Sequence, residues 1–131
     1  MTISAIKVPY WELLGIQLKE KSPGNVKLTM KVRDDLTQTA GLLHGGATAS
    51  LIDSAMGSAV RSLNVTSRGV TVEMKLNYIN SVVPGDEIEA EAKVIHNGNT
   101  LAVCTAEVKN RQGKLVCYGT ATFMLFRIDN S

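Results

Sequence analysis

The longest segment with a helical repeat runs from Gly46 to Leu63. Apolar residues recur there at intervals of three and four positions, which is the spacing of one helix face, while serines and an arginine fall on the opposite side. The interior is rich in Ala, Gly and Ser, which lets a helix backbone pack closely against its neighbour. The pattern therefore predicts one long helix pressed against a sheet.

Alternating apolar and polar positions predict β-strands on both sides of this helix. The predicted strands span residues 16–21, 26–32, 70–78, 87–94, 101–109 and 115–126, and a short helix over residues 7–15 precedes them. In the third strand Val70, Val72, Met74, Leu76 and Tyr78 alternate with Thr71, Glu73, Lys75 and Asn77, which puts the two sets on opposite faces. Connectors such as Pro84-Gly85-Asp86 and Asn97-Gly98-Asn99 are short and carry Gly where a tight reversal needs positive φ. Short connectors make neighbouring strands antiparallel. The predicted fold class is α+β, with an antiparallel β-sheet wrapped around one long central α-helix.

Composition narrows the class of protein. The chain has 131 residues, and its 44% hydrophobic and 20% charged residues are ordinary globular usage, so we expect a single domain over residues 1–131. A formal net charge of +2 is too small for a nucleic-acid-binding surface, and no four-ligand metal spacing exists. No signal peptide and no membrane-spanning apolar run is visible. We therefore expect a cytoplasmic protein without a metal, nucleic-acid or membrane partner.

The final strand indicates self-association, because residues 120–126 are apolar on both faces. A sheet that wraps a single helix also leaves its edge strands unpaired, which favours pairing with another chain. We expect a homodimer or a larger homo-oligomer.

The segment Gly41-Leu42-Leu43-His44-Gly45-Gly46 leads into the long helix and is the first candidate site. Adjacent glycines at a helix start leave backbone N–H groups bare, and the helix dipole adds about half a positive charge there. Such a start can hold a carbonyl oxygen and stabilise the oxyanion that forms on attack. Alternatively, the glycines only make a turn and His44 satisfies a local backbone group.

Asp53, in the middle of the predicted helix, is the second candidate. Aspartate has a poor helix propensity, and here its neighbours on the helix surface are small and apolar, with no cation three or four residues away. A carboxylate in such surroundings is usable as a base. The alternative is a solvated residue beside the stripe of Ser and Arg.

Three further features carry weaker predictions. His96 and the following Asn97-Gly98-Asn99-Thr100 form either a plain type I′ turn or a backbone-rich loop that holds phosphate groups. Cys104 and Cys117 lie among apolar residues and are predicted to be inert buried thiols. No serine has the Gly-x-Ser-x-Gly context of a hydrolase nucleophile.

With His44-Gly45-Gly46 followed by Asp53 on a long helix, the chain resembles the hotdog-fold acyl-CoA thioesterases. The nearest group is the PaaI-type one, which contains phenylacetate-degradation and 4-hydroxybenzoyl-CoA thioesterases, and the resemblance covers nearly the whole chain. It implies a hotdog fold and hydrolysis of an acyl-CoA thioester to free acid and coenzyme A, with no cofactor. It also implies dimers that pair their sheets edge to edge, tetramers built from two dimers, and sites shared between subunits.

The resemblance assigns roles to single residues. It implies that Asp53 acts as general base or nucleophile, that the Gly45 N–H receives the thioester oxygen, and that His44 shapes the helix start. Gln38 matches a position near the scissile bond, and Thr71 matches one that orients the water or the acyl end. The segments that match coenzyme A contacts are Tyr78, Ile79, Asn80 and Ser81, and the turn His96, Asn97, Gly98, Asn99, Thr100 and Leu101.

Two other functions stay open at this point. A non-catalytic acyl-CoA binder or sensor would keep Gly45 and use Asp53 structurally. A dehydratase that acts on acyl thioesters would need a His and a carboxylate placed together, whereas His44 lies at the helix start. The sequence leaves the acyl group, and the choice between coenzyme A and acyl carrier protein, undecided.

Overall fold

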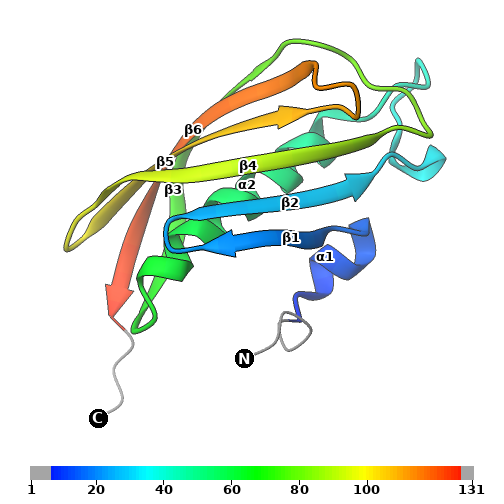
Figure 1. Cartoon of the computed structure of the whole chain (residues 1–131). Coiled ribbons are helices and arrows are strands. Elements are labelled where there is room, and N and C mark those ends of the chain that lie inside the picture. The colour runs from blue at the N-terminus through cyan, green and yellow to red at the C-terminus, as the bar shows by residue number, and fades with distance from the viewer. Residues whose placement is uncertain (1–6, 128–131) are drawn as a thin grey trace.

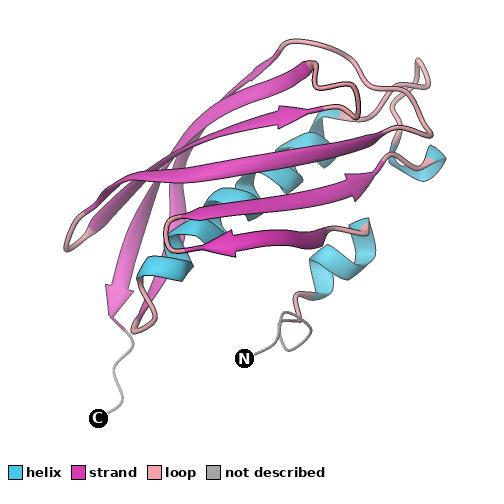
Figure 2. Ribbon diagram, viewed as in Figure 1, coloured by secondary structure: helices cyan, strands magenta, loops and turns pink. Residues whose placement is uncertain are grey.

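The computed structural model describes residues 7–127, which form one sheet curved around one long helix (Figures 1 and 2). The helical elements are α1 (Pro9–Leu14), the 3-10 helix η2 (Asp34–Leu36) and α2 (Gly45–Leu63). The strands are β1 (Gln17–Ser22), β2 (Asn25–Lys31), β3 (Ser67–Tyr78), β4 (Glu87–Asn97), β5 (Leu101–Lys109) and β6 (Leu115–Arg127). The predicted α+β fold class and the single long helix are confirmed, and each predicted strand has a counterpart.

The six strands pair in the order β1-β2-β4-β5-β6-β3, and every neighbouring pair is antiparallel. Strand β3, which follows α2 in the chain, therefore pairs with the last strand, and β1 and β3 form the two edges. Strand β3 also runs back along α2 in the opposite direction. Its start meets the end of the helix near Val60, and its last residue, Tyr78, meets the first residue of the helix, Gly45.

One face of α2 is buried against the inner side of the sheet. The helix residues without exposed surface are Leu51, Ile52, Ala55, Met56 and Ala59. Small residues opposite them let the helix approach closely, because interiors are packed without voids. Gly119 on β6 is one of these: a Cβ there would lie 3.2 Å from Cδ1 of Ile52 and 3.1 Å from the backbone oxygen of Lys75. The predicted close packing of helix on sheet is confirmed.

Two local predictions are wrong. Positive φ occurs at Gly85 and Gly113 but not at Gly98, so the β4–β5 connector is not a type I′ turn. The alternation along β3 is also interrupted, because its pairing with β6 shifts register between Thr71 and Glu73. This shift marks a β-bulge, in which the bulged strand contains one extra residue that has no partner opposite it.

Candidate active site

The start of α2 leaves one backbone N–H group without an acceptor. The first four N–H groups of a helix have no partner inside it. Here the N–H of His44 donates to the Leu36 carbonyl at 2.8 Å, that of Gly46 to Nδ1 of His44 at 2.8 Å, and that of Ala47 to the His44 carbonyl at 3.0 Å. Within residues 7–127, the Gly45 N–H has no such acceptor. The glycine predicted as oxyanion donor therefore carries the free amide of the first turn.

The side chain of His44 is the N-cap of α2. Because Nδ1 accepts a hydrogen bond, the neutral imidazole carries its proton on Nε2. Gly46 must stay small for this contact, since a Cβ there would lie 3.1 Å from Nδ1 and 3.3 Å from Cε1 of the ring. The imidazole thus satisfies a local backbone group, one of the two roles considered for it, and in doing so it fixes the helix start.

A hollow of about 290 Å³ opens beside this helix start, and we call it the α2 hollow. Its lining residues are Gln38, Leu42, Leu43, Gly45, Thr48, Tyr78, Ile79, Asn80, Ser81, Val82 and Val116. The backbone N–H of Leu43 donates to Val82, and the side-chain amide of Asn80 donates to the Leu115 carbonyl, so the walls are held together. The structure therefore brings together the predicted residues 38, 45 and 78–81.

Tyr78 closes one side of this hollow over the glycine pair. Its hydroxyl donates to the Gly45 carbonyl at 2.8 Å, and a Cβ on Gly45 would lie 3.4 Å from the tyrosine ring. Burial raises the pKa of Tyr78, and the neighbouring Cys117 adds to the rise, so the phenol keeps the proton that it donates. Gln38, in contrast, is exposed, and its side-chain oxygen accepts from the Ala40 N–H.

Asp53 lies half-buried two turns further along α2, on the side that faces β3. The hydroxyl of Thr71 donates to Oδ1 of Asp53 at 2.9 Å, so the two residues that the resemblance paired do meet. No Lys, Arg or His side chain of residues 7–127 forms an ion pair with this carboxylate. The second oxygen of Asp53 is left for another donor.

The bulge in β3 is what turns Thr71 toward Asp53. Thr71 pairs with Phe123, which is buried under the helix, whereas unbroken alternation from Met74 would put Val72 on that inner face. Instead Val70 and Val72 are 52% and 53% exposed. The predicted alternation is therefore wrong for the residues before the bulge, and the extra residue re-aims a hydroxyl, as bulges near functional sites do.

Within one chain, Gly45 and Asp53 are too far apart to act on the same atom. They are separated by eight residues of α2, or about 12 Å along the helix axis at 1.5 Å per residue. Asp53 is also absent from the lining of the α2 hollow. The oxyanion donor and the carboxylate of one chain thus belong to two different places on its surface.

The β4–β5 turn, predicted to hold coenzyme A, also lies away from the hollow of its own chain. The side-chain amide of Asn64, the C-cap of α2, donates to Oδ1 of Asn97 at 2.9 Å. The turn therefore sits at the C-terminal end of a 19-residue helix whose first residue lines the hollow. The structure does not bring residues 96–101 to residues 78–81 within one chain.

Sequence reasoning missed part of the lining of the hollow. Thr48, which is 3% exposed, follows Gly45 by three residues and so faces the same side of α2. The three-residue spacing from Gly45 is therefore a sequence signal that could have identified Thr48 as a lining residue. Val82 and Val116 come from a loop and from the start of β6, and nothing in their local sequence marks them as neighbours of the helix start.

The cysteines are unsuited to nucleophilic catalysis, as predicted. Both are buried free thiols; burial raises the pKa of Cys104 to about 12 and also raises that of Cys117.

In the described part of the chain no three His, Cys, Asp or Glu side chains are grouped as metal ligands would be. None of the helices over residues 7–127 has the length and apolar character to cross a membrane.

The capping role of His44 predicts unequal effects of two substitutions. His44→Ala removes the acceptor for the Gly46 N–H and should lower the free energy of unfolding by about 1 kcal/mol. His44→Asn keeps a side-chain acceptor at the cap and should stay close to wild type. Urea denaturation measures both, and equal stability of the two variants would contradict the assignment.

Comparison with known proteins places this geometry in a family. The model of the thioesterase superfamily matches residues 40–117, which include the α2 start, Asp53 and Thr71. Human acyl-coenzyme A thioesterase 13 is 35% identical over 108 residues, covering 82% of this chain and 77% of the relative.

Two solved structures are similar over most of their length. The Escherichia coli PaaI protein, from the phenylacetic acid degradation operon, is 27% identical with a TM-score of 0.84, covering 92% of this chain and 84% of that one. A hypothetical thioesterase from Streptococcus pneumoniae, solved with coenzyme A, is 28% identical with a TM-score of 0.81, covering 86% of each chain. From the matched family model, the sequence identity and the shared fold, we conclude that this chain belongs to the thioesterase superfamily and has its hotdog fold.

Proposed function

We propose that this protein is an acyl-CoA thioesterase that hydrolyses an acyl-CoA to a free acid and coenzyme A. The observation that carries the proposal is the free N–H of Gly45, which borders a hollow while the other first-turn amides are paired. The name of the human relative and the coenzyme A bound by the streptococcal structure support the choice of substrate. We take residues 1–131 as one catalytic domain that works in the cytoplasm without a metal or other cofactor.

The Gly45 N–H is the proposed oxyanion donor. A thioester carbonyl seated beside it accepts its hydrogen bond, and the positive end of the α2 dipole favours the charge that develops on the oxygen. One such donor typically lowers the barrier by roughly 3–4 kcal/mol. Gln38, which lines the same hollow, is placed to contact the substrate near the scissile bond.

Asp53 is the proposed general base. It takes a proton from water as the water oxygen attacks the carbonyl carbon, and the tetrahedral oxyanion then collapses with cleavage of the C–S bond. The proton returns to the sulfur of coenzyme A. Thr71 fixes one carboxylate oxygen, which leaves the other to face the water. Direct attack by Asp53 on the carbonyl, with an anhydride intermediate, uses the same placement.

The separation of Gly45 from Asp53 implies that the site is completed by a second chain. Strand β3 lies at a free edge of the sheet, beside Asp53, and pairing β3 with β3 of a second chain about a two-fold axis makes one continuous sheet. The two α2 helices then run antiparallel, so that Asp53 of each chain can meet Gly45 of the other. We propose this homodimer as the catalytic unit.

The same arrangement brings the two predicted coenzyme A segments together. If Asp53 of the second chain lies at Gly45, the C-terminal end of that chain's α2 extends about 15 Å beyond this point, since ten more residues follow. The β4–β5 turn of residues 96–101 sits at that end. We propose that residues 78–81 of one chain and residues 96–101 of the other hold coenzyme A.

The outer face of the sheet offers a surface for joining two dimers. Four exposed apolar side chains, Val70, Leu101, Met124 and Phe126, form what we call the apolar outer patch. Val70 and Leu101 flank Met124 in register, and the patch reaches the β3 edge, so the proposed dimer would double it.

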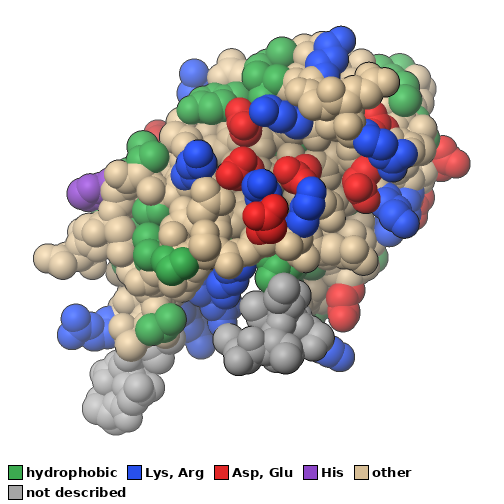
Figure 3. All heavy atoms as spheres, in the orientation of Figure 1, with side chains coloured by type: hydrophobic (Ala, Val, Ile, Leu, Met, Phe, Trp, Pro, Cys, Tyr) green, Lys and Arg blue, Asp and Glu red, His purple; other side chains and the backbone are tan. Residues whose placement is uncertain are grey.

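The other half of this face is charged. Figure 3 shows interleaved acidic and basic side chains there, and Lys19 pairs with Glu89 at 2.5 Å. A second dimer is therefore expected on the apolar half, and we propose a homotetramer that is built as a dimer of dimers.

A non-catalytic acyl-CoA binder is the second candidate, since the bond from Thr71 to Asp53 would also suit a structural carboxylate. Release of free thiol from a panel of acyl-CoA esters separates the two. Turnover of any member supports the enzyme, whereas tight binding without thiol release supports the binder. Acyl carrier protein thioesters in the same panel test the carrier.

A pair of substitutions at Gly45 isolates the oxyanion donor. Gly45→Pro removes the N–H and adds the proline ring, and the position accepts proline because it is the first helical residue and His44 already has the extended φ and ψ that precede proline. We expect kcat to fall about 10²–10³-fold. Gly45→Ala keeps the N–H and meets the Tyr78 ring at an ordinary 3.4 Å, so it is the matched control. Similar turnover of both variants would contradict the proposed donor.

Asp53→Asn should lower kcat by about 10²–10⁴-fold with KM little changed, because the amide cannot take a proton from water.

Mixing the Asp53→Asn variant with the Gly45→Pro variant then tests the shared site. Unfolding and refolding the two together makes half of the dimers mixed, and each mixed dimer has one intact site, so about one quarter of wild-type activity should return. No recovery would show that each site lies within one chain.

Placing a charge in the apolar outer patch should break the proposed tetramer. Met124→Lys should convert tetramers into active dimers in sedimentation experiments, because a lysine desolvated between two sheets is strongly unfavourable. Thr29→Lys adds the same charge to the charged half of the face and should leave the tetramer intact. Tetramers of Met124→Lys would rule out this surface.

A further inference from the structure

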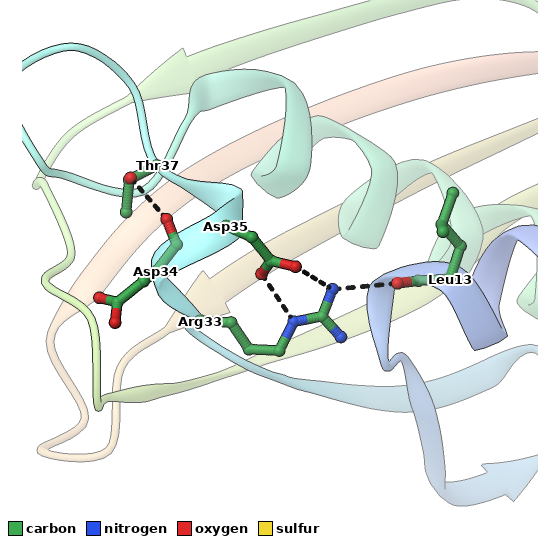
Figure 4. Close-up of polar contacts among 5 residues, drawn as sticks. All are labelled: Leu13, Arg33, Asp34, Asp35 and Thr37. Atoms are coloured by element: carbon green, nitrogen blue, oxygen red, sulfur yellow. Dashed lines mark hydrogen bonds and ion pairs between the residues drawn. The ribbon is translucent and has the colours of Figure 1, made fainter.

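The N-terminal helix α1 is docked firmly against the rest of the fold. Leu14 is buried in the core and Trp11 packs against it. At the end of α1, the guanidinium of Arg33 donates to the Leu13 carbonyl at 3.0 Å and to Asp35 at 2.9 Å, as Figure 4 shows. Helix α1 is thus tied to the segment η2, and the Leu36 carbonyl of η2 accepts the N–H of His44.

The other end of α1 reaches the first turn of α2 through a chain of hydroxyl groups. The hydroxyl of Tyr10 lies 2.7 Å from Oγ of Ser50, and Oγ of Ser50 donates to the Gly46 carbonyl at 2.9 Å. Because Ser50 uses its only proton on Gly46, it must accept the hydrogen bond from Tyr10. The direction of the chain is therefore fixed as Tyr10 to Ser50 to Gly46.

The hydrogen bonds from Tyr10 through Ser50 to Gly46 hold the peptides at the start of α2, which are the most deformable ones of this helix. Glycine loses more conformational freedom than any other residue when a helix forms, and here two glycines occupy the first two helical positions. Tyr78 already holds the Gly45 carbonyl from the β3 side. The hydroxyls of Tyr10 and Ser50 hold the next carbonyl, that of Gly46, from the α1 side.

We propose that Tyr10 is a positioning residue that, through Ser50, fixes the first turn of α2 and thereby the direction of the Gly45 N–H. This inference rests on the proposed function, because a fixed amide matters for rate only when that amide binds a developing oxyanion. Tyr10 does not line the α2 hollow, so its effect should appear in turnover and not in substrate binding.

The test is a double-mutant cycle with Tyr10→Phe, Ser50→Ala and both together. Each single variant should lower kcat about three- to tenfold with KM unchanged, which is the effect of losing one hydrogen bond in the transition state. The double variant should be no worse than Ser50→Ala, because both residues act through one chain. Tyr118→Phe is the matched control: it removes an exposed hydroxyl on β6 and should leave kcat unchanged.

Amide hydrogen exchange supplies a readout that needs no activity. Exchange of the amides of residues 46–48 should be faster in Tyr10→Phe than in Tyr118→Phe, while the melting temperature stays close to that of wild type. Unchanged exchange, additive effects on kcat, or a change confined to KM would overturn the positioning role. Absence of turnover in the wild-type protein would instead reject the proposed function, and the exchange rates would still decide whether Tyr10 fixes the helix start.

Discussion

The chemistry proposed for this protein depends on how the first turn of α2 distributes its free N–H groups. A helix start exposes four donors. The N–H of His44 donates to the Leu36 carbonyl, and His44 itself accepts from two others, the Ala47 N–H at its backbone carbonyl and the Gly46 N–H at its imidazole. The remaining donor, on Gly45, has no hydrogen-bond acceptor within residues 7–127. The histidine cap and the Leu36 carbonyl therefore determine which amide is left for a ligand, and the two glycines after the cap add no side chains beside it.

In the proposed dimer, two chains are needed because Gly45 and Asp53 lie far apart along α2. Because the helix backbone is rigid, it keeps the Gly45 amide and the Asp53 carboxylate at a fixed separation that no side-chain motion closes. Two antiparallel copies cancel that separation, because the offset of one helix is reversed by the other. In the proposed dimer, the distance between the two groups sets the offset of the two helices, so the same stretch of sequence would specify both catalysis and assembly.

Most of the fold could be predicted from periodicity, because the core positions of α2 and the alternation in β2, β4 and β5 report burial directly. The candidate residues Gly45 and Asp53 were found from their local context. The bulge at Val72 was not, since a bulge depends on pairing between strands far apart in the sequence, and the local pattern of Val70 to Met74 reads as an unbroken strand. The link from Tyr10 to Ser50 joins residues forty positions apart and has no local signal either. Contacts of this kind are set by tertiary structure alone.

The two edges of the sheet differ in a way that governs how assembly stops. Strand β1 is six residues long, carries Lys19, Glu20 and Lys21, and has its own register shift beside Glu20, whereas β3 is twelve residues long with exposed valines at its bulge. Joining β1 of one molecule to β3 of the next would produce an endless ribbon, but the short charged edge is a poor template for it. Joining like to like at β3 uses up the better edge in a single step. The difference between the two sheet edges thus limits further growth of the sheet, which favours a closed oligomer over a fibre.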